Sequence, residues 1–405
     1  MIAPERRTRG DLIAAAAIAV TVAVFIGTVW WNSSTRATIS RPADAPAAKV
    51  DSAESVPAAL QQRWTATSAR TLTPIVVSNT VVTADGRTVS GLDPQTGQQR
   101  WVYARDTQLC GVSYVYDLAV AVYPDSRGCG QVSGIKAGTG QRGPTRTSYA
   151  DNQVVLTTDG SAVLSTGPTR LELWRSDLVR ILSYGEIDAR VKPVNKGLGT
   201  GCTLMSAAAS DEAVSVLEAC RDKKDLRLTL IKPAKEEDEP DTKNVDLPGL
   251  AVDAEARVLA VSDTTTAVFL PTPRPAVVVY DDTGTKVSET ELRSPAVLSG
   301  AAPAVTRAGD LITWWTGTAV MVFDKKLGYR FTLDATDALG PATMMAGRLL
   351  VPVPAGLAVY NPADGAQERV IGIVHPDGTG AVIPAVSGST VVEQRGAAMA
   401  GFGPT

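Results

Sequence analysis

Four cysteines are the residues of this sequence whose spacing most directly suggests chemistry. Cys110 is close in sequence to Cys129, and Cys202 is close to Cys220, each pair within a segment rich in β-forming residues. Neither pair has the Cys-x-x-Cys spacing of zinc ligands, and the single histidine, His375, is distant from both. We therefore expect two local disulfides, Cys110–Cys129 and Cys202–Cys220, each closing one β-hairpin in an oxidising compartment. Four buried free thiols are the alternative interpretation.

Other residues that could act chemically lack the partners that such chemistry needs. His375 has no neighbouring nucleophile or second histidine, so it is predicted to be a loop residue. The glycine-rich segment 197–201 lacks the Lys-Ser/Thr that follows phosphate-binding loops and is predicted to be a turn. The charged segment 232–243 is predicted to be a solvated loop, with docking or cation binding as the alternative. We predict no catalytic residues, no metal ligands and no cofactor, and hence a protein that is not an enzyme.

Two adjacent tryptophans, Trp314 and Trp315, are the candidate surface for a ligand or partner. Adjacent residues of a strand face opposite sides of the sheet, so only one of the two can pack in a given layer between sheets. The other could line a rim or channel, where an amphipathic ring suits sugars or lipids. Packing of both in the core is the favoured interpretation. Trp101 and Trp174 are expected between neighbouring sheets.

The N-terminal region has the pattern of a membrane anchor. Residues 1–11 contain Arg6, Arg7 and Arg9, and they precede residues 12–31, a segment without a single charge. A helix of that length rises about 30 Å, the thickness of the hydrocarbon core. Trp30 and Trp31 at its end are typical of a membrane interface, and they do not resemble a cleavage site. We therefore favour an uncleaved, single-pass signal anchor with a cytoplasmic N-terminus over a cleaved signal peptide; both export the remaining chain.

Residues 32–59 are rich in alanine, proline and serine and show no hydrophobic period. This composition predicts a disordered stalk between the membrane and the domain formed by residues 60–405. A flexible stalk of this length would reach roughly 30 Å from the membrane.

The composition of the whole chain favours a β-protein with a large core. Of its 405 residues, 44% are hydrophobic but only 5% aromatic, whereas glycine (35) and proline (25) are plentiful, as many turns require. The net charge of −3 argues against nucleic acid as a partner, because no basic stripe is present to neutralise phosphates.

Short units repeat along residues 60–405. The sequence VSGLDPQTGQQRW (89–101) is followed by the similar VSGIKAGTGQRG (132–143), and related units begin at residues 276, 319 and 357. In each, a strand is followed by a short turn that glycine closes. Asp93 and Asp281 are expected to accept hydrogen bonds from these turns.

These units resemble the PQQ-type propeller repeat, in which a hydrophobic strand precedes Asp-x-x-Thr-Gly and a fourth strand that bears tryptophan. The first unit matches at Asp93, Gly97 and Trp101, whereas Lys136 replaces the acid in the second. The resemblance covers about residues 60–402 and implies an all-β propeller. Grouping the strands predicts eight blades, with seven as the alternative, and assigns Gln61–Trp64 to the last blade as its missing strand. The predicted blades are 72–105, 110–148, 151–190, 200–248, 255–293, 303–334, 341–373 and 381–402.

The resemblance also bears on function. Quinoprotein dehydrogenases share the repeat, so an oxidoreductase that uses the propeller funnel is the alternative function; the vicinal cysteines common in that family are absent from this sequence. The anchored, degenerate propeller looks like envelope proteins of mycolate-making actinobacteria. That likeness implies a periplasmic scaffold for cell-envelope assembly, with an envelope transporter or assembly protein as partner. It further implies support of trehalose monomycolate transport and polar growth, with glycolipid as a ligand.

Overall fold

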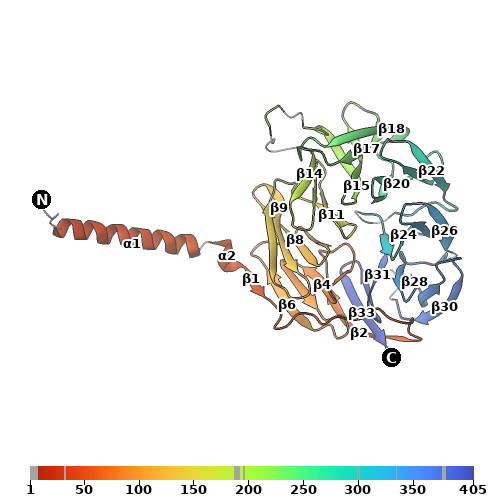
Figure 1. Ribbon diagram of the computed structural model, residues 1–405, viewed down its shortest axis with the longest axis horizontal. Coiled ribbons are helices and arrows are strands. Elements are labelled where there is room, and N and C mark those ends of the chain that lie inside the picture. The colour runs from red at the N-terminus through yellow and green to blue at the C-terminus, as the bar shows by residue number, and fades with distance from the viewer. Residues whose placement is uncertain are drawn as a thin grey trace.

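The structure is a computed structural model that describes residues 8–31, 33–186, 192–194, 197–298, 300, 302–333, 335–375 and 380–405. Eight antiparallel sheets are arranged radially around a central axis, and the chain passes round the ring once (Figure 1). The fold is thus an eight-bladed β-propeller, as the repeat spacing predicted, and the seven-bladed alternative is wrong.

The first four blades contain consecutive strands that run from the axis to the perimeter. Blade 1 contains β3 (Ile75–Val77), β4 (Thr80–Asp85), β5 (Thr88–Leu92) and β6 (Gln99–Ala104); blade 2 contains β7 (Gly111–Val115), β8 (Leu118–Asp125), β9 (Gly128–Lys136) and β10 (Arg142–Thr147). Blade 3 contains β11 (Val155–Thr158), β12 (Val163–Thr166), β13 (Arg170–Trp174) and β14 (Arg180–Gly185); blade 4 contains β15 (Cys202–Ala209), β16 (Val214–Cys220), β17 (Asp225–Lys232) and β18 (Asp241–Ala251).

Blades 5–7 repeat this order, and blade 8 combines the two ends of the propeller sequence. Blade 5 contains β19 (Arg257–Ser262), β20 (Thr265–Leu270), β21 (Ala276–Tyr280) and β22 (Lys286–Glu291); blade 6 contains β23 (Val305–Ala308), β24 (Leu311–Trp315), β25 (Val320–Asp324) and β26 (Tyr329–Leu333). Blade 7 contains β27 (Thr343–Met345), β28 (Arg348–Val353), β29 (Gly356–Tyr360) and β30 (Gln367–Gly372); blade 8 contains β31 (Val382–Ser387), β32 (Thr390–Arg395), β33 (Ala398–Pro404) and β2 (Leu60–Thr67).

The ring closes where β2 pairs with β33, the last strand of the chain. Trp64 lies opposite Gly401 in this antiparallel pair, and Leu60 lies opposite Pro404. The predicted contribution of Gln61–Trp64 to the last blade is therefore confirmed. Closure leaves blades 1 and 8 as neighbours, so the ring has no open sheet at either end.

Turns at the repeat units hold the third and fourth strands of a blade in register. In blade 1, the Oδ1 atom of Asp93 accepts hydrogen bonds from the backbone N–H groups of Gln95 and Thr96, both at 3.0 Å. Gly97 follows with φ of 70°, a conformation that glycine adopts without strain. Asp281 makes the equivalent bonds in blade 5, which confirms the role predicted for these two aspartates.

The same turns receive tryptophans from the preceding blade. The Nε1–H of Trp64 in blade 8 donates to the Pro94 carbonyl oxygen of blade 1 at 2.8 Å. Trp101 in blade 1 likewise donates to the Ala137 carbonyl oxygen of blade 2 at 2.6 Å. A Cβ added at Gly97 would lie 2.5 Å from Trp64, so the turn needs glycine for closeness as well as for φ. Trp101 thus packs between blades, as predicted.

Residues 39–59, which we call the N-terminal strap, lie along the ring and do not form the predicted disordered stalk. β1 (Ile39–Arg41) pairs with β6 as a fifth strand of blade 1. The backbone N–H of Ala43 then donates to a turn of blade 2 at 2.8 Å, and Arg369 of blade 7 donates to the Val56 carbonyl oxygen at 2.8 Å. Backbone hydrogen bonds hold this segment on the ring. Such bonds leave no hydrophobic period in the sequence, so the segment could not be recognised as ordered from its composition.

The strap changes how the propeller is connected to the N-terminal helix. That helix, α1 (Arg9–Trp31), is followed by the short helix α2 (Ser34–Ala37). The strap begins at residue 39, directly after the single residue that follows α2. The connection between α1 and the ring is thus limited to residues 32–38, of which 32 lies outside the described residues. A seven-residue connection cannot span the roughly 30 Å expected of a long flexible stalk.

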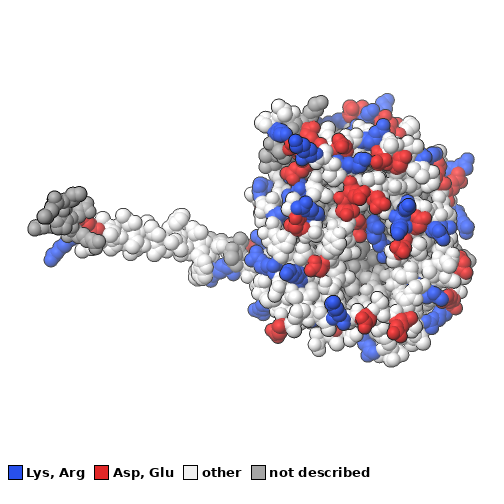
Figure 2. All heavy atoms as spheres, viewed as in Figure 1, with Lys and Arg blue, Asp and Glu red and all other residues white. Residues whose placement is uncertain are grey.

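Among the described residues, α1 alone is long and apolar enough to cross a membrane. Its side chains are exposed along the whole helix, and Figure 2 shows it almost free of charge, in contrast to the charged surface of the ring. A membrane anchor and a signal sequence both have these properties.

Candidate functional site

The central channel of the ring contains a hollow that is lined by both apolar and polar residues. The innermost strand of every blade contributes to its wall, and its volume is 370 Å³. Ala208, Val258 and Ile383 are among the apolar residues of this wall. A hollow of this size lies within the range of small-molecule sites, about 300–1,000 Å³.

Charged and aromatic polar groups of the channel gather where the inner strands end. Asp159 directly follows β11, and Arg307 and Tyr114 lie near the ends of β23 and β7. Arg307 Nη2 is 3.8 Å from an oxygen of Asp159, and the Arg307 side chain remains 38% exposed. Burial raises the pKa of Tyr114, and the Asp159 carboxylate raises it further, so this phenol stays neutral at physiological pH.

The opposite mouth, where the inner strands begin, has no charged side chain among its described lining residues. Leu72 and Pro74 precede β3 there, and Ala302 and Pro303 precede β23. Leu72 is 44% exposed, which leaves an apolar side chain available at this mouth. The channel is therefore asymmetric, with an apolar entrance and a polar end.

Neither tryptophan of the candidate ligand surface lines the channel. Trp314 is 1% exposed and packs against Phe269 with ring centroids 5.3 Å apart, so it presents no surface to a ligand. Trp315 is half-buried, and its Nε1–H donates to the Ala338 carbonyl oxygen at 2.9 Å. Trp314 therefore packs between blades, as the favoured interpretation of this pair expected, whereas Trp315 also borders a small hollow beside Pro303 and Ala304.

Both predicted disulfides are present. Cys202 and Cys220 lie opposite each other in the hairpin β15–β16, as expected. Cys110 precedes β7 and bonds to Cys129 in β9, so this disulfide links the first and third strands of its blade across β8. The expectation that each disulfide closes a single hairpin therefore holds for one of the two. Disulfides of this kind are typical of proteins in an oxidising compartment.

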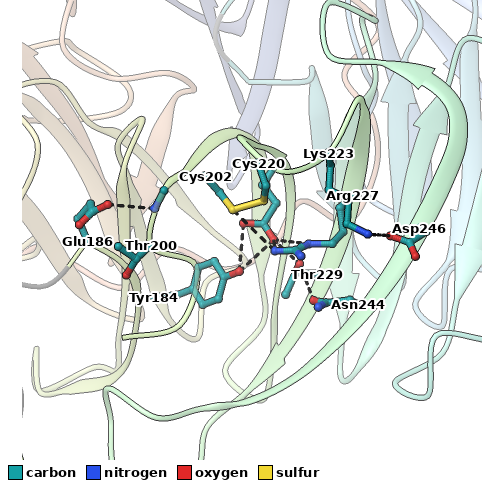
Figure 3. The surroundings of a disulfide bond; sticks show 12 residues. Tyr184, Glu186, Thr200, Cys202, Cys220, Lys223, Arg227, Thr229, Asn244 and Asp246 are labelled. Carbon is teal, nitrogen blue, oxygen red and sulfur yellow. Dashed lines mark hydrogen bonds and ion pairs between the residues drawn. A yellow bond between two sulfur atoms is a disulfide. The ribbon is translucent and has the colours of Figure 1, made fainter. Parts of the chain in front are cut away.

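Glu218 is fully buried and lies close to both sulfur atoms of the second disulfide. Figure 3 shows the surroundings of this disulfide, with Tyr184 and Arg227 near Cys202 and Cys220. The Glu218 carboxylate accepts hydrogen bonds from Arg227 at 2.8 Å and from the Tyr184 hydroxyl of blade 3 at 2.9 Å. Burial raises the pKa of Tyr184, and the Glu218 charge raises it further. Cys202, Glu218 and Cys220 are close enough to share a metal ion, but the disulfide leaves no thiolate to bind one.

His375 belongs to a second buried cluster. It lies in a loop, as predicted, but its side chain is 1% exposed. Its Nδ1 is 2.7 Å from the Val353 carbonyl oxygen, and its Nε2 is 3.1 Å from the Glu393 carboxylate. Arg395 also donates to Glu393 at 2.5 Å. This cluster ties the loop after blade 7 to blade 8.

A third cluster, in blades 2 and 3, surrounds Glu172. Arg170 donates to its carboxylate at 2.6 Å and Arg180 at 2.9 Å, and the Nη2 atom of Arg146 in blade 2 is 3.4 Å away. Burial raises the pKa of Glu172, but the three arginines outweigh burial and bring the pKa down to about 2. Trp174 donates to the same carboxylate at 2.9 Å and belongs to a core cluster with Leu118 and Val132 of blade 2, which confirms its predicted place between blades.

These three buried glutamates are the features that the sequence interpretation missed. The Arg170-x-Glu172-x-Trp174 alternation places all three side chains on one face of β13, and Glu393-x-Arg395 does the same in β32. Charged residues that alternate within otherwise apolar strands are thus a signal that could have revealed buried ion pairs. The turn predicted near 197–201 and the loop predicted within 232–243 are both present, the latter as residues 233–240.

Comparisons with known proteins identify the fold of this chain and no family. No protein-family model and no curated protein sequence matches the chain. Among solved structures, the computationally designed Ika8 protein matches with a TM-score of 0.52 and 13% identity over 88% of this chain and 99% of that one. Sqt1 of Saccharomyces cerevisiae matches with a TM-score of 0.51 and 11% identity over 88% and 100%. The dihydro-heme d1 dehydrogenase NirN matches with a TM-score of 0.48 and 15% identity over 86% and 76%.

At these identities the solved structures share a fold with this chain and indicate no activity. The β-propeller is a common binding scaffold. The comparisons do not support the resemblance to actinobacterial envelope proteins.

Proposed function

We propose that this chain is a non-enzymatic, membrane-anchored binding propeller that holds an acyl-chain ligand in its central channel during cell-envelope assembly. The observation that carries the proposal is the asymmetry of the channel, with an apolar entrance at Leu72 and Pro303 and a polar end at Arg307 and Asp159. A glycolipid matches this asymmetry, because its chain is apolar and its sugar offers hydroxyl groups to the polar end.

The connection to α1 supports a ligand from the membrane. If α1 is the anchor, residues 32–38 keep the ring near the bilayer, where a ligand with an acyl chain is concentrated. The two disulfides support a position on the outer side of that membrane. Transport of a glycolipid such as trehalose monomycolate, with an envelope transporter as partner, is the finer form of the proposal.

A photoactivatable palmitate tests the channel directly. The full chain is placed in lipid nanodiscs with this probe, irradiated and digested, and the labelled peptides are identified by mass spectrometry. We expect label on the inner strands β15 and β19 as well as on α1. Ala208→Phe places a large ring in the channel wall and should abolish the label on β15 and β19. Ala363→Phe, at an exposed turn of blade 7, is the matched control and should retain it.

Three outcomes would contradict the proposal. Label confined to α1 in the unmodified chain would show that the channel does not take an acyl chain. A quinone absorption band and dye reduction after reconstitution with PQQ and Ca²⁺ would favour the oxidoreductase alternative. Crosslinking in the native membrane should recover an envelope transporter or assembly protein, and recovery of nothing above background would remove the scaffold role.

A further inference from the structure

A second hollow lies at the outer edge of the ring, between blades 2 and 3, and is separate from the central channel. Its volume is 440 Å³. The turn between β8 and β9, the outer strand β10 and the β13–β14 turn form its walls. Its charged lining residues are four arginines and two acids: Arg127, Arg146, Arg170, Arg180, Asp177 and Glu237.

Positive charge exceeds negative charge at the inner end of this hollow. Arg146, Arg170 and Arg180 converge on the single buried carboxylate of Glu172. Among the described residues, the ion-pair partner of Glu237 is Arg180. The other two charged lining residues are paired elsewhere, Arg127 with Asp125 and Asp177 with Arg175. The three inner guanidinium groups therefore face two carboxylates, which leaves one positive charge uncompensated in a partly desolvated place. Burial lowers the pKa of Arg146 because Glu172 does not fully offset the loss of solvent.

The same three arginines also have hydrogen-bonding capacity that nothing uses. The Nε–H groups of Arg146, Arg170 and Arg180 are buried and have no partner among the described residues. The Arg170 side chain is 4% exposed. A buried donor without a partner is costly, and such groups in native proteins usually indicate an ion or water that completes the site.

Glu237 reaches the hollow from blade 4, which does not otherwise line it. It belongs to the charged loop 233–240 of blade 4, and its backbone carbonyl oxygen accepts a hydrogen bond from the Ser183 N–H of blade 3 at 2.7 Å. Its side chain is 34% exposed and reaches Arg180 at the hollow. The backbone contact fixes the loop, whereas the carboxylate is held at the hollow by Arg180 and is partly open to solvent. The lining also offers hydroxyl groups of Thr145, Thr147 and Tyr149.

We propose that the hollow between blades 2 and 3 is a binding site for a phosphate group, and that the Glu237 carboxylate holds Arg180 until the phosphate replaces it. Arginine favours this ligand, because its planar guanidinium donates two parallel hydrogen bonds to phosphate oxygens. A dianion also supplies more charge than the carboxylate that it displaces. The inference concerns a ligand other than the acyl chain of the channel, so each proposal can fail without the other.

Calorimetric titration of the full chain, in an uncharged detergent, with inorganic phosphate tests the site. We expect saturable binding that Arg180→Gln weakens about tenfold or more, because a charge-assisted pair is lost. Glu237→Gln removes the competing carboxylate and should tighten binding by roughly threefold or more. Glu291→Gln is the matched control, since Glu291 also pairs with an arginine at the surface but lies in blade 5. It should leave phosphate binding unchanged.

Glu237→Gln keeps the test informative if Arg180→Gln fails to fold, which thermal unfolding would show. Absence of phosphate binding in both the unmodified chain and Glu237→Gln would overturn the proposal. Equal binding by Glu237→Gln and the unmodified chain would overturn the role of Glu237. The phosphate group could belong to a soluble phosphate ester or to a lipid headgroup. Binding of glucose 6-phosphate in solution would indicate a soluble ester. Tighter binding of the chain to nanodiscs that contain phosphatidylglycerol than to uncharged nanodiscs would indicate a lipid headgroup.

Discussion

Neighbouring blades are joined by two different kinds of contact in two parts of the ring. From blade 8 to blade 2, the indoles of Trp64 and Trp101 each insert over a turn of the next blade and donate one hydrogen bond to it. From blade 2 to blade 4, buried glutamates join the blades, with Glu172 contacting Arg146 and Glu218 contacting Tyr184.

We call these two kinds of contact tryptophan joints and glutamate joints. They differ in how their stability depends on their surroundings. A tryptophan joint gains from apolar burial and one neutral hydrogen bond, so pH and the loss of a distant partner do not affect it. A glutamate joint places charges in a desolvated interior, where each charge depends on the presence of all the others. The ring thus combines blades whose contacts tolerate a change of pH or the loss of a charged partner with blades whose contacts do not.

The largest expected effect is the loss of the Glu172 carboxylate. Glu172→Ala should lower the free energy of unfolding by about 3–5 kcal/mol, because it leaves three arginines without their buried partner. Urea unfolding of the full chain in detergent measures this change. Glu289→Ala is the control, since Glu289 forms an exposed pair with Lys286, and it should cost about 0.5 kcal/mol or less. Equal effects of the two substitutions would erase the distinction between the joints.

The pH dependence of stability should reveal the same joint in the unmodified chain. The folded pKa of Glu172 is depressed from 4.5 to about 2, so its contribution is fully present above its unfolded pKa and is lost as pH falls through the folded value. This contribution is about 3 kcal/mol. Glu172→Gln should therefore flatten the stability profile between pH 5 and 2, as unfolding at each pH would show. An unchanged profile would contradict the assigned ion cluster.

The smallest expected effect concerns the tryptophan joints. Trp101→Phe removes the N–H that bonds to Ala137 and leaves that buried carbonyl oxygen without its donor, which should cost about 1–3 kcal/mol. Trp64→Phe is the matched substitution at the neighbouring joint and should cost a similar amount. Both costs should be the same at pH 7 and pH 4, in contrast to Glu172→Ala. A strong pH dependence of the Trp101→Phe effect would show that the joints are not physically distinct.

The sequence predicted the features that depend on local pattern. Asp93, Gly97 and Trp101 are spaced as a turn and its neighbouring strand require, and this spacing led to the blades, to their number and to the closure by Trp64. The cysteine pairs were equally local. Each of these features depends on residues that are close in the sequence or repeat at a fixed interval.

The features that the sequence did not reveal depend on contacts between distant segments. The strap bonds through its backbone to three blades, and no side-chain pattern records such bonds. Glu237 reaches Arg180 only because the loop of blade 4 folds back over blade 3. The channel likewise takes its lining from every blade, so its apolar entrance could be described only after the ring was assembled.

The pairing of β2 with β33 has a consequence for how the protein is made. β2 is synthesised before any other strand of the ring except β1, and its partner is the last strand of the chain. At about 5–20 residues per second, synthesis of the intervening sequence takes on the order of tens of seconds. Throughout this time β2 has an unpaired edge, and the nascent ring must remain soluble without its final contact. Blade 8 can therefore be completed only after the strands of all seven other blades have been synthesised.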